Sequence, residues 1–419
     1  MESWEQSTHY AGLDWASDHH DVVAVDRQGQ IVRQFRIAHT AEGWQELAAR
    51  LRELGTVAVA VETNQGFALE QLLAQGLIVY PVNPKSAQRY RERKAPSGVK
   101  NDQLDAWSLA DALRLDGHAW KALASEDPLV AELRLLTRDE VALIAQRTAL
   151  VNQLMAALRD YYPAALEAFD DWTLPSAWAF LERFPTPQAL VKAGQRAWEK
   201  FLHTHRLYRP ETYPRRLEIF ARADQFTGSA ALTSARSLLA TTLAAMLRTL
   251  EAQLKLYRQR IEALFGQHPD HDLFGSLPGA AAKLAPRLLA ELGSDRSRFE
   301  SAESLQCYAG TAPLTIQSGQ MIKRLIRHAC QHALRATVHL WANASRSACA
   351  WAQAYYQAHR DKGQSHACAL RCLGQRWLKI LWKMWQTKTP YDAELHAMNQ
   401  QKHGSWVLKL APANAAKTV

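Results

Sequence analysis

The chain has 419 residues, enough for two or three domains, and its 47% content of hydrophobic residues is sufficient for buried cores. Its formal net charge of +9 at pH 7 favours a polyanionic partner, although basic composition alone does not establish one. The five cysteines include no CxxC pair and the start of the chain is polar and acidic, which disfavours a secreted disulfide protein and predicts a cytoplasmic one. No uninterrupted apolar run reaches about 18 residues, so no membrane span is expected.

Residues 9–117 carry the pattern of an α/β fold. Strands are predicted at 9–16, 21–26 and 31–38, then a helix at 41–54, a strand at 57–61, a helix at 67–74 and a strand at 77–82. The run 57–61 is apolar throughout, as expected of a central strand buried on both faces. Three leading strands followed by alternating helices and strands predict a mixed sheet of the ribonuclease H type.

From residue 128 onward the pattern is helical. Apolar residues recur at helical spacing from 128 to about 162 and again from 231 to 265. These two long helices are expected to pair as an antiparallel stalk or to form a seam between protomers. Between them, about 165–230 reads as a smaller irregular helical insertion. Residues 271–400 are expected to be helical with a loop at 310–319, and 404–419 to be a disordered tail.

Four acids form a candidate metal site. Asp102 and Asp105 begin a predicted helix and, at a spacing of three, lie on one helical face. Asp14 interrupts an apolar strand, and Glu62 follows the strand 57–61, at a strand end where open sheets place functional groups. Any one acid is usually a solvated surface group. The order strand-Asp, strand-Glu, helix Asp-x-x-Asp nevertheless suits a nuclease that holds one or two Mg²⁺ ions in all-oxygen ligation.

A candidate nucleophile, Ser318, precedes Gly319 in the predicted loop. A serine before a glycine is common, but here cations follow it at once: Lys323, Arg324, Arg327 and, further on, Arg335. They predict a surface that contacts a phosphodiester beside an accessible hydroxyl. Because no Ser/His/Asp set is evident in the local spacing, activation of the serine is assigned to the metal site.

Further basic segments predict contacts with nucleic acid. One stretch holds five cations and a single acid, and one more lysine lies beside the acidic helix: Lys85, Arg89, Arg91, Arg93, Lys94 and Lys100. It is either a solvated helix face or a phosphate-binding surface. The segment 206–210, with Arg215 and Arg216, is a weaker candidate of the same kind. The turn 277–279 before an apolar helix is either a plain turn or a helix-hairpin-helix-like phosphate contact.

Together these motifs resemble the DEDD transposases of bacterial insertion sequences, the "IS one-ten" family of serine-type recombinases. The resemblance covers nearly the whole chain. It runs from Gly12-Leu-Asp14 through Glu62 to Lys100-Asn-Asp102-x-x-Asp105, and from Leu277-Pro-Gly279 through Gly310-Thr-Ala-Pro313 to Ser318-Gly319 and His328–Arg335. Each motif alone is weak, but the set in this order is specific. Gln320 departs from the pattern, because a basic residue often follows the Ser-Gly pair.

The resemblance implies a RuvC-like domain at 9–120, a helical stalk at 125–270 and a C-terminal transposase domain at 271–400. It implies that Asp14, Glu62, Asp102 and Asp105 hold Mg²⁺, and that Ser318 attacks a DNA phosphate to give a covalent phosphoserine intermediate before strand exchange. The implied partners are donor and target DNA, a structured bridge RNA that guides the enzyme, and further copies of the chain in a dimer or tetramer. The implied location is the bacterial cytoplasm, at the nucleoid.

Two alternatives stay open at this point. The first is a RuvC-like metal nuclease, such as a junction resolvase, in which Ser318 is only a loop residue and Ser318→Ala stays active. The second is a non-enzymatic nucleic-acid-binding protein derived from a transposase. The intact set of four acids argues against the second, because a copy released from selection loses such residues early.

Overall fold

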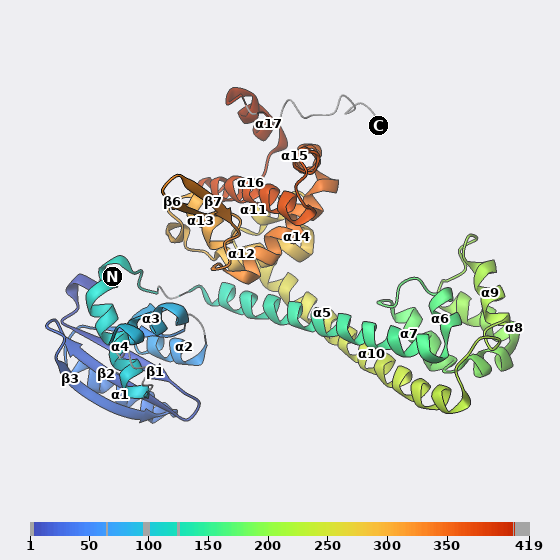
Figure 1. Ribbon diagram of the computed structural model, residues 1–419, viewed down its shortest axis with the longest axis horizontal. Helices are drawn as coiled ribbons and strands as arrows, with labels where there is room; N and C mark the ends of the chain where they lie inside the picture. The colour runs from blue at the N-terminus through green and yellow to red at the C-terminus, as the bar shows by residue number, and fades with distance from the viewer. Residues whose placement is uncertain (1–3, 64–65, 95–100, 124–125, 405, 407–419) are drawn as a thin grey trace. The chain divides into compact units, whose positions relative to one another are not determined.

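The computed structural model describes residues 4–63, 66–94, 101–123, 126–404 and 406. The chain divides into two compact units, residues 1–125 and 126–419. The first unit is α/β and the second is almost entirely helical (Figure 1). The predicted fold class, an α/β part followed by an all-α part, is confirmed at this level.

A five-stranded mixed sheet forms the first unit. Its strands are β1 (His9–Trp15), β2 (His19–Asp26), β3 (Ile31–Ala38), β4 (Val57–Val61) and β5 (Ile78–Pro81). The spatial order is β3-β2-β1-β4-β5, with β1, β2 and β3 antiparallel and β1, β4 and β5 parallel. All five predicted strands are present, and the largest difference is that β2 begins two residues early, at His19.

Helices cover both faces of this sheet. Helices α1 (Ala41–Arg52) and α2 (Phe67–Ala74) pack on one face, where they bury Leu13 and Val59. Helices α3 (Pro84–Lys94) and α4 (Asp102–Asp116) pack on the other, which presents Tyr10, Val23, Ala58 and Ala60. Since side chains alternate along a strand, β4 is apolar at every position because both of its faces are covered.

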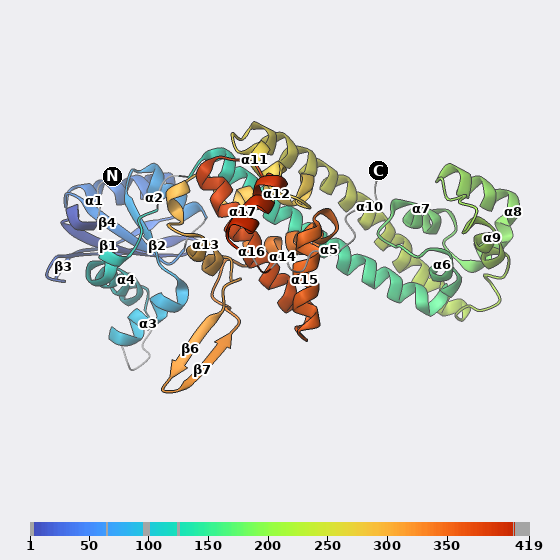
Figure 2. The same ribbon diagram turned by 90° about the horizontal axis from the view of Figure 1, so that it is seen from above.

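Two long helices form the stalk of the second unit, α5 (Pro128–Tyr161) and α10 (Ala230–Gln267). They run antiparallel along each other, since ion pairs join Arg147 to Glu251, Arg260 to Glu132 and Arg236 to Asp160 in opposite chain order (Figures 1 and 2). The predicted helices are therefore confirmed to within two residues, and the structure shows them paired within one chain.

Both stalk helices are long and apolar enough to cross a membrane by length and composition alone. The expectation of no membrane span counted only uninterrupted apolar runs, whereas these helices intersperse isolated polar residues. Two such helices are weak evidence for a span, because the core helix of a soluble protein meets the same criteria. Less than a third of each apolar window is buried within the described chain. On α10 the exposed residues include Leu232, Leu239 and Met246, at seven-residue spacing.

The insertion and the C-terminal region have separate hydrophobic cores at opposite ends of the stalk (Figures 1 and 2). The insertion contains α6 (Pro163–Ala168), α7 (Pro175–Arg183), α8 (Pro187–Thr204) and α9 (Tyr213–Ala221). The C-terminal region contains α11 (His271–Gly275), α12 (Ala281–Leu292), α13 (Ala302–Tyr308), α14 (His332–Ala348), α15 (Ala350–Asp361), α16 (His366–Thr387) and α17 (Ala393–Lys402). Most of the predicted disordered tail lies outside the described residues, which there include only Gly404 and Trp406.

A β-hairpin replaces the predicted loop at 310–319. Strands β6 (Leu314–Ser318) and β7 (Met321–Leu325) pair antiparallel around the two-residue turn Gly319-Gln320, with Ser318 opposite Met321. The loop prediction was wrong because it weighed Ser-Gly and the cations above the strand pattern, in which β-branched Thr315, Ile316 and Ile322 favour an extended chain. Gly319 has φ +57, a conformation that glycine adopts at little cost.

Candidate active site

Strand alternation places three acids on the α4 side of the sheet. Every second residue of a strand faces the same side of the sheet. Asp14 therefore shares the α4 side with Tyr10 and Gly12 of β1, and Glu62, which follows β4, shares it with Ala58 and Ala60. Asp21 of β2 lies directly opposite Asp14 across the antiparallel pair. Residues opposite each other in this way have Cβ atoms about 4.5–5.5 Å apart. The two aspartates would repel each other unless positive charge lies close by.

Helix α4 brings the other two predicted acids to the same end of the sheet. It packs on the bare backbone of Gly12, where an added Cβ would lie 1.9 Å from the carbonyl oxygen of Ala106. Asp102 and Asp105 occupy the first turn of α4, one turn before this contact. The side chain of Asn101 caps the helix by accepting hydrogen bonds from the backbone N–H groups of Gln103 and Leu104. The positive end of the helix dipole favours acids in this turn.

Electrostatics show that the acids lie close enough to affect one another. The pKa of Asp14 is raised to about 6, first by burial and then by the negative charges of Asp105, Asp102, Glu62 and Asp21. Each of these neighbours disfavours the charged form of Asp14. The structure therefore brings together all four acids predicted from the sequence, together with a fifth, Asp21.

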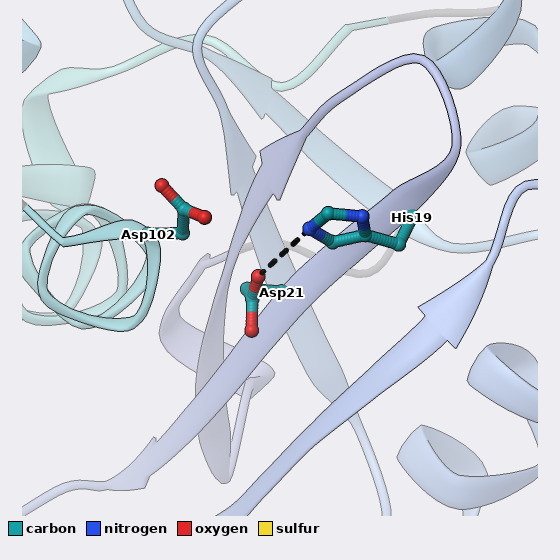
Figure 3. Close-up of side chains that lie close together, drawn as sticks. All are labelled: His19, Asp21 and Asp102. Carbon is teal, nitrogen blue, oxygen red and sulfur yellow. Dashed lines mark ion pairs between the residues drawn. The ribbon is translucent and has the colours of Figure 1, made fainter.

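Asp21 and His19 are the residues that sequence reasoning missed. His19, Asp21 and Asp102 each offer a possible ligand atom, and these atoms lie within 4.8 Å of one another. Figure 3 shows the three side chains close together. The Nε2 atom of His19 is 3.9 Å from Oδ2 of Asp21. A signal was present in the sequence: Asp14 and Asp21 lie at equal distances from the turn around Ser17-Asp18, which places them opposite each other in a hairpin.

Two arginines neutralise part of the cluster. Arg91 of α3 donates from Nη1 to both carboxylate oxygens of Asp105, at 3.0 Å each. Arg36 of β3 donates from Nε and Nη2 to the carboxylate of the buried Asp21, at 3.2 and 2.8 Å, and its Nη2 lies 3.9 Å from Asp102. Arg91, predicted to contact nucleic acid, is therefore engaged with an acid of the site in this structure.

The other predicted cations of α3 are available to solvent. Lys85, Arg89 and Arg93 are exposed and follow one another at four-residue spacing, which places them along one side of the helix. The side chain of Lys94 and the whole of Lys100 lie outside the described residues. The described part of α3 thus offers one charged ridge next to the arginine that contacts the acidic site.

Ser318 lies at the end of β6, where every residue of both hairpin strands is exposed. Leu314, Ile316 and Ser318 lie on one face of the hairpin with their cross-strand partners Leu325, Lys323 and Met321, whereas Arg324 lies on the other face. Lys323 and Arg324 thus extend from opposite faces. Arg335 on α14 and Arg327 lie beyond the hairpin, with an Nη1 of Arg335 3.4 Å from the carbonyl oxygen of Arg327.

The turn before α12 has the backbone of a tight turn. Gly279 has φ +76 and Ala281 has φ +42, so alanine stands at a position that favours glycine. A Cβ on Gly279 would collide with the backbone at Ser345 of α14, so this glycine is required for packing. Residues 281–283 begin α12 on the surface. A contact between this turn and DNA phosphate stays a prediction.

Comparison with known proteins gives consistent matches at both ends of the chain. A transposase model of the IS110 DEDD type matches residues 11–163, and a model described as "Transposase IS116/IS110/IS902 family" matches residues 271–357. The first match spans the strands and the helix that carry the acids, and the second spans the hairpin with Ser318.

Relatives match over the same regions. A mini-circle putative transposase for IS117 from Streptomyces coelicolor is 34% identical over 407 residues, which cover 93% of this chain and 97% of the relative. A putative transposase, y4uE, from Sinorhizobium fredii is 35% identical over 49% of this chain and 59% of its own length. The IS900 uncharacterized 42 kDa protein from Mycobacterium paratuberculosis is 26% identical over 91% of this chain and 96% of its own. With similarity that runs along almost the entire length, the chain belongs to the IS110 family of insertion-sequence transposases.

Proposed function

We propose that the protein cleaves and exchanges DNA strands with the acidic cluster as its metal site and Ser318 as its nucleophile. The observation that carries this proposal is the convergence of five acids, Asp14, Asp21, Glu62, Asp102 and Asp105. Burial first, and then the charges of the other four acids, raise the pKa of Asp14 to about 6. Such a concentration of carboxylates at the end of a buried sheet is typical of a site built for a cation. Membership of a transposase family makes DNA the substrate.

The topology supports a ribonuclease H-like, RuvC-type first unit. Its antiparallel β1, β2 and β3 precede parallel β4 and β5, and the acids occupy the ends of β1 and β4 and the start of α4. We assign the stalk and the C-terminal helices, with the hairpin, to the coiled-coil and transposase parts that the family implies. The helix-hairpin-helix-like turn at 277–279 belongs to the same assignment.

The donor set fits Mg²⁺, which prefers carboxylate oxygens and retains water. Asp14, Glu62, Asp102 and Asp21 would hold one or two ions, and Asp105 joins them when Arg91 is displaced. The metal would neutralise phosphate oxygens and stabilise the attacking and leaving groups. Arg36 and Arg91 hold the carboxylates in place, since each binds its acid through paired hydrogen bonds.

Ser318 supplies the proposed covalent step. Its Oγ forms a bond to phosphorus, the bond from phosphorus to the leaving sugar oxygen breaks, the leaving oxygen takes up a proton and the serine proton passes to solvent. The exposed position of Ser318 at the end of β6, with Lys323 on the same hairpin face, leaves room for a phosphodiester. Strand exchange reverses this step with a different sugar hydroxyl.

Donor and target DNA, a guiding bridge RNA and further copies of the chain are the proposed partners, in the bacterial cytoplasm at the nucleoid. The exposed Lys85, Arg89 and Arg93 suit phosphate contacts of either nucleic acid. The uncharged, exposed heptad positions Leu232, Leu239 and Met246 on α10 suit a contact with a second stalk, in a dimer or tetramer.

A covalent-trapping assay tests this function. Purified protein, Mg²⁺, labelled element-end DNA and RNA transcribed from the element's flanks are mixed, denatured and separated on a gel. We expect a protein–DNA adduct that disappears with Ser318→Ala and with Asp102→Asn but persists with Thr315→Ala, which alters the same hairpin. An adduct that survives Ser318→Ala would overturn the assignment of the nucleophile.

One observation favours a second candidate, the RuvC-like metal nuclease without covalent catalysis. Among the described residues, no side chain that can act as a base is hydrogen-bonded to Ser318, so its activation depends on groups brought to it in the reacting complex. In the same assay this alternative predicts Mg²⁺-dependent cleavage without an adduct, unaffected by Ser318→Ala and abolished by Asp102→Asn.

A further inference from the structure

The insertion carries a basic and aromatic surface that the strand-exchange chemistry does not use. It is formed by the second half of α8 and the connection to α9, at the end of the stalk where α5 ends and α10 begins (Figures 1 and 2). Its exposed side chains define what we call the α8–α9 surface: Arg196, Lys200, His203, Arg206, Tyr208 and Arg209.

Tyr208 is the aromatic centre of the α8–α9 surface. Its ring stacks on the imidazole of His203, with ring centroids 4.8 Å apart and planes 20° apart. Tyr213 lies edge-on to the same imidazole at 5.8 Å. Although Tyr208 is held in this way, 51% of it remains exposed. The result is a tyrosine fixed in orientation with part of its ring open to solvent.

Arg206 adopts a backbone conformation that normally selects glycine. Helix α8 ends with a hydrogen bond from the N–H of Leu207 to the carbonyl of Leu202, the pattern of a Schellman cap, and Arg206 occupies the left-handed position with φ +56. A non-glycine residue there lowers fold stability relative to glycine. The cap therefore gains nothing from an arginine, whose charged side chain extends into solvent.

The basic residues of the insertion fall into two groups. Arg215, Arg216 and Arg222 are engaged within the fold, because they donate to the backbone of Glu167 and Ala168 or to the Glu167 carboxylate. In contrast, among the described residues no acid forms an ion pair with the cations of the α8–α9 surface. The structure thus separates arginines that hold the fold from cations available to a ligand.

We propose that the α8–α9 surface binds unpaired nucleotides of a single-stranded nucleic acid. Its cations contact the phosphates, and a base stacks on the open part of the Tyr208 ring. This combination of cations and a fixed aromatic side chain is suited to single strands, because the bases of a duplex are already stacked on one another. The surface does not recognise a sequence, since every base has a stacking face.

Binding of fluorescein-labelled 12-mers to the full-length protein tests this proposal. The probes are oligo(U), oligo(dT) and a blunt 12-base-pair duplex, all in EDTA so that metal-dependent chemistry plays no part. For Tyr208→Ala we expect about 5- to 100-fold weaker binding of the better single strand, and for Tyr208→Phe a value near wild type. Stronger binding of oligo(U) identifies RNA as the natural source, and stronger binding of oligo(dT) identifies a displaced DNA strand.

Arg206→Gly separates binding from folding. Glycine suits the left-handed position, so the melting temperature should stay the same or rise while affinity falls. The slope of log K against log salt should become shallower by about 0.7, the contribution of one cation on a single strand. Matched controls are Lys255→Gln, an exposed cation of α10, and Phe226→Ala, an exposed aromatic residue of the insertion; both should bind like wild type.

Photocrosslinking locates the contact. A 12-mer with 5-iodouridine should crosslink to the peptide that contains Tyr208, because this probe reacts with stacked aromatic rings. Unchanged binding by both Tyr208→Ala and Arg206→Gly, preference for the duplex, or crosslinks confined to other peptides would each overturn the proposal. Because none of these readouts needs strand cleavage, they remain valid if the proposed serine chemistry fails.

Discussion

The acidic site and the Ser318 hairpin are held in opposite ways. The acids are fixed by a buried sheet, a capped helix and two arginines, whereas both strands of the hairpin are exposed along their whole length. Carboxylates repel, so a cluster of them needs a rigid scaffold that resists separation. A hydroxyl carries no such cost and needs only to be reached by its substrate. In the first unit, the contacts that stabilise the fold also position the acids. In the hairpin, the proposed nucleophile lies outside the contacts that stabilise the fold.

The largest expected effect comes from Gly12→Ala. Its Cβ would lie 1.9 Å from the carbonyl oxygen of Ala106 and would push α4 away from the sheet. We expect a loss of about 3 kcal/mol and a fall of about 10 °C in the melting temperature of the first unit, together with loss of strand cleavage. Gly266→Ala is the control, because nothing lies near its Cβ in α10. A stable, active Gly12→Ala protein would show that the scaffold is not rigid.

Asp14→Asn should abolish metal-dependent cleavage yet stabilise the metal-free fold. The pKa of Asp14 is raised to about 6 in the folded chain. Between the usual aspartate pKa and this value, Asp14 is therefore protonated in the folded chain and ionised in the unfolded chain. Stability contributed by the protonated form is therefore lost as pH rises from about 4 to 6. At pH 7.5 without metal, Asp14→Asn should melt about 2–5 °C higher than wild type, and near pH 4 the two should agree.

Magnesium should reverse this order in a thermal-shift measurement. It should raise the melting temperature of the wild type at pH 7.5 and raise that of Asp14→Asn much less, because the neutral amide of asparagine binds Mg²⁺ more weakly than a carboxylate does. Glu46→Gln, which removes a carboxylate from α1 on the other face of the sheet, should behave as wild type. Equal shifts in all three proteins would mean that the acids do not bind the metal.

Asp21→Asn should have an intermediate effect. The change keeps the shape of the side chain but weakens its hydrogen bonds from Arg36 and removes one charge opposite Asp14. We expect about 10-fold weaker binding of Mn²⁺ or Mg²⁺ by calorimetry, a loss within the range seen when a group beside a metal site is removed. Metal affinity equal to that of the wild type would make Asp21 a purely structural partner of Arg36.

The smallest effect on stability is expected for Ser318→Ala. The side chain is exposed and lies on a hairpin whose strands contribute little to any core, so the melting temperature should change by less than about 1 °C and the metal-induced shift should be unchanged. Circular dichroism melting with and without Mg²⁺ measures both. A clear loss of stability would show that the serine has a structural role and would weaken its use as a chemical probe.

Much of the fold follows from local sequence patterns. The strands β1–β5 and the stalk helices were predictable because two-residue and 3.6-residue periodicities report which faces are buried. The hairpin was missed because its strands have no buried face to impose an apolar alternation, which left the β-branched Thr315, Ile316 and Ile322 as a weak signal.

The four principal acids of the site were predictable from the sequence, but the arginines that pair with acids of the site were not. Asp14, Glu62, Asp102 and Asp105 were identifiable because each lies at a strand end or a helix start. The contact of Arg91 with Asp105 was not, because α3 and α4 meet only in the folded sheet-helix arrangement. Asp21 was missed because one charged residue at the start of a strand usually faces solvent, and only its register against Asp14 distinguishes it.

The two arginines of the acidic site set its charge balance. Counted by formal charge, the five carboxylates and the guanidinium groups of Arg36 and Arg91 sum to three negative charges. One divalent ion leaves a single negative charge, and two leave a single positive one. Only the second state matches the charge of one DNA phosphodiester, so a fully loaded site and its substrate together become neutral.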